Sequence, residues 1–234
     1  MISISCAIMH SPFSSERRRC LEAMIQQLSP EAIAESWHDC QIFGDFHRRG
    51  HWWNAKRCME WGVSLRSTHH LILQDDIMFC QDFVAGLHKL IEVWPDEIIS
   101  LFFGPRKTFK KGGRWGDAEG PWGQAVIYPH DMLSEFLEWQ REHIKPTLRH
   151  DDTRVTLFCD GTDRTVKVPF PNVIDHIDDM KSTLNHKGFV PRISDDFLSG
   201  SIFDIDWSDT SDMRRSVNSV YNDKKWLVSD PNLS

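Results

Sequence analysis

Two adjacent carboxylates, Asp75 and Asp76, stand at the end of the apolar run in HHLILQDDIMF, residues 69–79. Two acidic side chains side by side repel each other, so stability alone gives no reason for the pair. A hard divalent cation takes oxygen ligands and keeps several waters, so one or two carboxylates together with ligand phosphates form a common Mg²⁺ or Mn²⁺ site. The pair therefore predicts a metal-phosphate site. A solvated turn or the N-cap of the next helix is the alternative.

A second acidic pair, Asp151 and Asp152, lies in LRHDDTRV at a predicted junction between a loop and a helix. One of these carboxylates could act as a general base that takes a proton from an acceptor hydroxyl. Helix capping is the alternative, because acidic side chains are favoured in a first helical turn. His176, in PFPNVIDHIDDMKST, could add a neutral imidazole ligand near a cation, or could simply be a structural hydrogen-bonding residue.

A run of positive charge forms the third candidate element. Within nine residues and with no interleaved acid stand Arg106, Lys107, Lys110, Lys111 and Arg114. In a chain of formal net charge −7 such a run predicts a local anion-attracting patch, although a solvated loop has the same composition. The neighbouring Gly112 and Gly113 favour a mobile substrate loop.

Strand-like and helical segments alternate along the chain and must position these groups. Buried strands are predicted at residues 2–9, 69–74, 98–103, 124–129 and 165–170, with a weaker strand at 36–43 that ends near Asp39. Helical spacing of apolar residues predicts helices at 15–28, 52–63, 83–94, around 132–137 and from 151 or 152. This alternation predicts an α/β fold with a mainly parallel sheet and helices on both faces. Ligands of such sheets bind beyond the carboxyl ends of the strands, where Asp75 and Asp76 stand.

The whole chain sets wider bounds. Its 234 residues predict one domain at 1–200, followed by a loosely packed or partly helical tail at 201–234. No apolar run reaches about 18 residues and no export signal is evident, so we expect a protein without a membrane span, in the cytoplasm. The six scattered cysteines read as reduced thiols, not as a disulfide framework or a zinc site.

Five segments, in consistent order over residues 2–200, resemble glycosyltransferases of the GT-A fold. HLILQDDI…F is similar to the LILEDDV…F segment of lipooligosaccharide-type enzymes, a variant of the Asp-x-Asp metal motif. NAKRCMEWG, WGQAVIYP, HDDTRV and VPFPNVIDHIDDMKSTL resemble small bacterial and phage-type glycosyltransferases. The resemblance implies a Rossmann-like GT-A fold, Mn²⁺ or Mg²⁺, and a nucleotide-diphosphate sugar donor, most simply a UDP-sugar.

The resemblance also implies a role for particular residues. The nucleotide base and ribose would be bordered by Met9, His10, Asp39, His51, Trp52 and Asn54. Asp75 would meet the ribose or the metal, Asp76 the metal, and His176 would complete the metal shell. The floor between donor sugar and acceptor would be formed by Trp122, Gly123 and Gln124. Ser182 and Arg192 would touch the diphosphate, and Asp152 or Asp151 would be the base.

One position departs from the standard motif, because Gln74 stands where Asp-x-Asp enzymes place their first acid. Metal binding would then rest on Asp76 with help from His176.

Two acceptor classes fit the sequence. One is a 5-hydroxymethylpyrimidine such as 5-hydroxymethylcytosine in phage DNA, modified in the host cytoplasm, with the basic loop on backbone phosphates and Trp115 or Trp122 beside an extruded base. The other is a saccharide or a lipid-linked glycan. A metal-dependent phosphoesterase and a non-catalytic nucleotide- or DNA-binding module remain as different classes. The transferred group, hexose or pentose, and the oligomeric state stay open. The stereochemical outcome also stays open, because a retaining reaction would need neither Asp151 nor Asp152 as a base.

Overall fold

The computed structural model describes residues 1–28, 37–104, 113–177, 193–194, 196–215 and 226–228. Within these residues the main sheet has eight strands in the order β10-β6-β8-β5-β7-β3-β1-β2, and β4 and β9 form a separate pair. The sheet is mixed, since four of the strand contacts are parallel and three are antiparallel. The predicted α/β class is confirmed.

The first part of the chain forms a parallel unit. Strand β1 (Ile4–His10) lies between β2 (Asp39–Gly44) and β3 (His69–Gln74), and both neighbours run parallel to it. The connecting helices are α1 (Ser15–Gln27), which Ser14 caps, and α3 (His51–Ser64). Because Met9 pairs with Gln74, the ends of β1 and β3 are level, and the residues that follow both strands meet at one edge.

The second part of the chain extends this sheet in mixed directions. Strand β7 (Ala125–Pro129) runs antiparallel to β3 and also to β5 (Ile99–Ser100). Beyond β5 lie β8 (Val166–Pro169), β6 (Trp115–Ala118) and β10 (Arg214–Arg215). The helices of this part are α4 (Phe83–Val93), α5 (His130–His143) and α6 (Asp151–Gly161).

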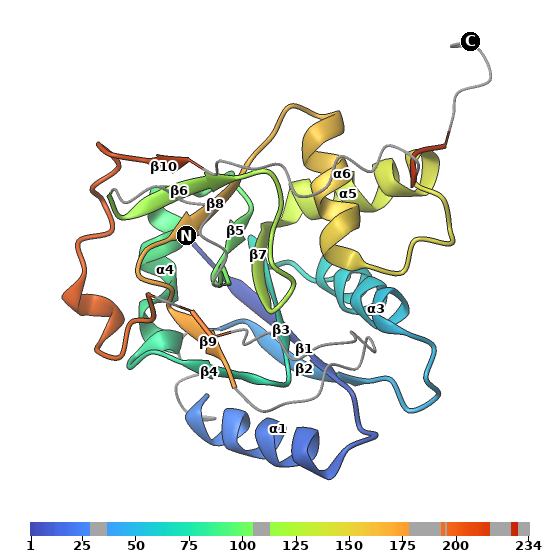
Figure 1. Ribbon diagram of the computed structural model, residues 1–234, viewed down its shortest axis with the longest axis horizontal. Coiled ribbons are helices and arrows are strands. Elements are labelled where there is room, and N and C mark those ends of the chain that lie inside the picture. Colours follow the sequence, from blue (N-terminus) through green and yellow to red (C-terminus); the bar gives the residue numbers. More distant parts are fainter. Residues whose placement is uncertain (29–36, 105–112, 178–192, 195, 216–225, 229–234) are drawn as a thin grey trace.

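Helices cover both faces of the sheet. Side chains alternate between the two faces along each buried strand, so neighbouring residues of one strand contact different helices. On β3, Leu71 and Leu73 pack with residues of α1 and α4, whereas Ile72 packs with residues of α3 and α5. Figure 1 shows the same division, with α1 and α4 apart from the group formed by α3, α5 and α6. None of the described helices is long and apolar enough to cross a membrane.

Some strands differ from the predicted ones. The strand expected at 98–103 is only Ile99–Ser100, and β6, which was not predicted, directly follows the run of positive charge that ends at Arg114. Strands β4 (Ile77–Phe79) and β9 (Ile174–His176) pair with each other outside the main sheet. These short strands depend on long-range pairing, which leaves little periodicity in the sequence.

The segment from residue 201 contributes to the core where the structure describes it. Ile202, in the short 3₁₀-helix η1 (Ile202–Asp204), is fully buried, and Trp207 is 3% exposed. The indole of Trp115 donates to the Trp207 carbonyl over 2.7 Å. The packing joins these residues to the main hydrophobic core, and the boundary at residue 200 stays a prediction.

Candidate active site

Asp75 is 1% exposed and is held by groups from β1 and α1. Its Oδ2 lies 2.6 Å from Nδ1 of His10 and accepts the Ser11 amide at 2.8 Å. Its Oδ1 accepts a hydrogen bond from Nη1 of Arg17. Both oxygens of this carboxylate are therefore used inside the protein.

Asp76 is fully buried and contacts the same guanidinium. Nη2 of Arg17 donates to its Oδ2 over 2.6 Å, and Nε2 of His176 lies 3.0 Å from that oxygen. The β4–β9 ladder places His176 there, because His176 is the register partner of Ile77 and the amide of Ile177 donates to the Asp76 carbonyl. His176 thus lies beside Asp76.

Arg17 was not among the predicted site residues, although it bridges the two carboxylates. It lies in the first turn of α1, is 6% exposed, and shares the buried face with Leu21 and Met24. Burial lowers its pKa, but the charges of Asp76 and Asp75 outweigh burial and raise the pKa overall. The sequence did carry a signal, because Arg17, Leu21, Met24 and Leu28 follow helical spacing and place a charge on the core-facing stripe.

The donor set at this pair does not fit a divalent cation. A metal needs several oxygen or imidazole lone pairs directed at one point. Asp75 and Asp76 instead direct oxygens at Arg17, whose nitrogens are donors only. Among the described residues no group of three or more His, Cys, Asp and Glu side chains is arranged to hold a metal ion.

A second cluster brings together the start of α6 and the start of α3. Nδ1 of His51 lies 2.8 Å from Oδ1 of Asp151. Nε2 of His51 lies 3.1 Å from the side-chain nitrogen of Gln74, which also donates to the Gly123 carbonyl over 2.8 Å. A side chain at Gly123 would contact Asp151 and Gln74, so these groups converge on one small space.

The charges in this cluster shift the pKa values of the two neighbouring acids in opposite directions. Burial opposes protonation of His51, but the charge and direct contact of Asp151, followed by the charges of Asp152 and Asp76, raise its pKa to about 9. Burial raises the pKa of Asp151, yet His51 outweighs that effect and holds it below the usual value. Burial and then the charge of Asp151 raise the pKa of Asp152. Environments that move the pKa values of two paired acids in opposite directions mark different chemical roles for the two acids.

Gln74 links the two clusters. It ends β3 directly before Asp75 and Asp76, and its backbone amide donates to the Gln124 carbonyl over 2.8 Å. The position that departs from the Asp-x-Asp pattern thus holds an amide that positions His51 and the Gly123 backbone. The Asp75–Asp76 pair and the Asp151–His51 pair form one site beyond the end of β3.

Other predicted residues surround this site but are used in packing. Met9 is a buried core residue on β1, and Trp52 packs edge-on against Phe136 with Arg154 over its ring. The side-chain amide of Asn54 donates to the Phe43 carbonyl.

Trp122 and Gln124 lie on either side of Gly123. Trp122 packs against Phe102 and Phe103. Gln124 is buried, and its side-chain oxygen has no hydrogen-bond partner in the described part of the chain.

The predicted position of Asp39 requires a correction. Strand β2 begins at Asp39 and does not end there, so this exposed residue lies at the far end of the sheet, roughly 17 Å of strand from Gly44. Asp45, which follows β2, was missed. It is buried, and its carboxylate accepts the amides of Arg49 and Gly50 at 2.8 Å each, which shapes the loop before α3.

The remaining predicted residues belong to the basic loop, its neighbour Trp115 and the segment after β9. Outside the described residues lie Ser182 and Arg192 and four members of the basic loop, Arg106, Lys107, Lys110 and Lys111. Arg114 is described and is exposed just before β6. Trp115, expected beside an extruded base, is instead fully buried and packs against Trp94 and Trp207, so it is closed to a ligand.

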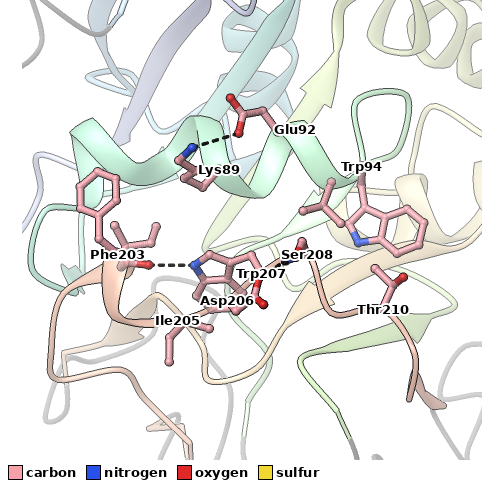
Figure 2. A pocket seen from close by; sticks show the side chains of 11 residues that line it. Lys89, Glu92, Trp94, Phe203, Ile205, Asp206, Trp207, Ser208 and Thr210 are labelled. Atoms are coloured by element: carbon pink, nitrogen blue, oxygen red, sulfur yellow. Dashed lines mark hydrogen bonds and ion pairs between the residues drawn. The ribbon is translucent and has the colours of Figure 1, made fainter.

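A pocket of about 580 Å³ lies elsewhere, between α4 and the segment after residue 201. Figure 2 shows the Lys89–Glu92 ion pair and Trp94 on one side and Phe203, Ile205 and Trp207 on the other. Of the predicted site residues that the structure describes, none lines this pocket.

Comparisons with known proteins give structural likeness only. The sequence matches no protein-family model, and no curated protein matches it. A197 from STIV has a TM-score of 0.49 at 11% identity, covering 76% of this chain and 87% of that one. Mannose-1-phosphate geranyltransferase from Thermus thermophilus has a TM-score of 0.43 at 14% identity, covering 72% and 74%. A glycosyltransferase involved in glycosylation of the major capsid of PBCV-1 has a TM-score of 0.44 at 12% identity, covering 76% and 94%.

Proposed function

We propose that this protein is a GT-A-type glycosyltransferase that moves a hexosyl or pentosyl group from a nucleotide-diphosphate sugar, most simply a UDP-sugar, to an acceptor hydroxyl. Two lines support the proposal: the order of the five sequence segments and the arrangement beyond the end of β3. The observation that carries it is the convergence of Asp151 and His51 on Gln74 and Gly123, directly beside Asp75 and Asp76.

Asp152 is our candidate for the general base. Its raised pKa suits a carboxylate that must accept a proton near neutral pH. The acceptor oxygen would bond to the anomeric carbon, the bond from that carbon to the diphosphate oxygen would break, and the hydroxyl proton would pass to Asp152. Attack from the face opposite the leaving group inverts the anomeric carbon.

Asp151 and His51 would have a different role. Asp151 stays ionised and holds His51, which is positively charged below a pKa of about 9. A fixed positive charge lowers the barrier when it lies where negative charge develops, here on the departing diphosphate.

The sequence-based prediction of Mn²⁺ or Mg²⁺ at Asp75, Asp76 and His176 enters no step of this proposal. The carboxylates contact Arg17, and this contact leaves the donor set unsuited to a metal.

The acceptor we favour is a 5-hydroxymethylpyrimidine in phage DNA, with a saccharide or lipid-linked glycan as the other class. Support for DNA comes from the sequence resemblance and from the run of positive charge that ends at Arg114. Phosphate contacts make binding salt-dependent, so transfer to DNA should fall steeply as salt is added.

A donor screen tests the proposal. The protein is incubated with nucleotide sugars and with unmodified DNA, 5-hydroxymethylcytosine DNA or saccharide acceptors, and the products are read by mass. A fixed hexose or pentose increment on one acceptor is the expected result. Binding of donors with no transfer to any acceptor would indicate a non-catalytic module. Release of phosphate without an acceptor would indicate a phosphoesterase.

A further inference from the structure

The strongest feature that the proposed reaction leaves unused is Arg17. It is a buried arginine whose two terminal nitrogens each donate to a different carboxylate, Asp75 through Nη1 and Asp76 through Nη2. Charge-assisted contacts of this kind fix geometry as well as charge. The guanidinium thus occupies the position between the two acids that a bridging cation would take.

The surroundings of Arg17 hold it in this position. Its own amide donates to the capping hydroxyl of Ser14 over 3.1 Å, so the residue is fixed in the first turn of α1. The following residues on the same helix face, Leu21 and Met24, are buried in the core. Arg18 and Arg19, its neighbours in the chain, are exposed.

A divalent cation bound by both carboxylates would have to displace a contact that Asp75 now makes. Asp75 uses Oδ1 for Arg17 and Oδ2 for His10 and Ser11, so it has to give up an existing contact to ligate a metal. A displaced guanidinium would also lose two charged partners inside a buried region, where an unpaired charge is costly.

The geometry points to Arg17 as the built-in cation of this acidic pair, so that the protein binds no divalent metal at Asp75 and Asp76. This inference deepens the proposed function, because it concerns the charge balance of the same site. It rests on the proposed function only for the claim that sugar transfer proceeds without added metal.

Metal binding can be measured without any sugar transfer. Mn²⁺ is titrated into the wild-type protein, and free Mn²⁺ is followed by electron paramagnetic resonance up to about 1 mM, the weak end of oxygen-ligand sites. We expect no saturable binding and no change in Tm. Saturable binding that disappears in Asp76→Asn would overturn the inference.

Variants sharpen the test. Arg17→Ala should leave the carboxylates unneutralised and lower the Tm. Added Mn²⁺ should then raise the Tm of Arg17→Ala but not that of Arg17→Ala/Asp76→Asn. Arg18→Ala, an exposed arginine on the same helix, is the matched control and should behave as wild type. If Arg17→Ala does not fold, the wild-type titration decides by itself. Should no donor give transfer while wild-type Mn²⁺ binding is absent, the proposed function fails and the inference on Arg17 stands.

Discussion

Nη2 of Arg17 lies 2.6 Å from Oδ2 of Asp76, although 59 positions separate the two residues in the sequence. The contact joins the first turn of α1 to the residues that follow β3. It also answers why two adjacent carboxylates are tolerated at a buried strand end: one guanidinium contacts both, and His10 and His176 flank them.

Replacing Arg17 with Ala should destabilise the protein strongly. The change leaves two carboxylates buried beside each other, and breaking a buried ion pair by removing one partner costs about 3–5 kcal/mol. Urea unfolding measures the loss, and Arg18→Ala should stay within about 0.5 kcal/mol of wild type because surface substitutions cost little. A loss below about 1 kcal/mol for Arg17→Ala would show that the pair does not depend on this charge.

The His51–Asp151 pair should make stability fall as pH rises. The pKa of His51 is raised from 6.5 to about 9 in the folded chain, so the folded state binds more protons than the unfolded state between these values. The stabilisation is fully present below about pH 6.5 and is lost as pH passes through about 9. This stabilisation is on the order of 3 kcal/mol. That value is an upper limit, because donation from Gln74 to Nε2 favours the neutral ring.

Unfolding free energies measured between pH 6 and 10 check this prediction, and His51→Gln supplies the comparison. The variant should lose the fall in unfolding free energy with rising pH that wild type shows in this range. Parallel pH profiles for the two proteins would show that His51 does not keep its raised pKa.

The segment after residue 201 should be required for a stable domain. Trp207 is buried against Trp115, and replacing a buried tryptophan with Ala costs about 3–5 kcal/mol. Trp207→Ala should therefore lower the free energy of unfolding by that order. Phe203→Ala, at an exposed residue of the same segment, should have little effect. Equal and small effects would support a separate tail.

The sequence is most informative where elements are long and regularly patterned. The strand predicted at residues 69–74 forms β3 with the same bounds, because the apolar run Leu71-Ile72-Leu73 between polar residues favours a short buried strand. The residues that meet in the two clusters, Asp76 with His176 and His51 with Gly123 and Asp151, also lie among the predicted site residues.

Other features depend on contacts that the sequence pattern does not display. Arg17 was missed because a single charge on a helix stripe belongs to no motif and its partners lie far away in the sequence. The antiparallel direction of β7 was not predicted, since an apolar five-residue strand reads the same in either direction. Asp39 was placed at the wrong end of β2 because the weak strand has no clear boundary.

Replacing one or the other of the two acids of α6 should have different effects on the transfer reaction. Asp152→Asn removes the proposed base and should lower kcat by about 10²–10⁴-fold, the range expected for general base catalysis. Asp151→Asn should instead release His51, so that transfer loses its pH dependence near pH 9. Initial rates from pH 6 to 10 measure both effects. Unchanged kcat in Asp152→Asn would remove this residue from the mechanism.

The most direct test of the account is sugar transfer measured by mass in the presence of EDTA, with wild type and Asp152→Asn side by side. We predict a fixed sugar increment on one acceptor with wild type, retained in EDTA and lost or strongly reduced in the variant. Absence of any increment across donors and acceptors, with the protein folded, would contradict the proposed function. Transfer that EDTA abolishes and Mn²⁺ restores would contradict the assignment of Arg17 as the cation of the site.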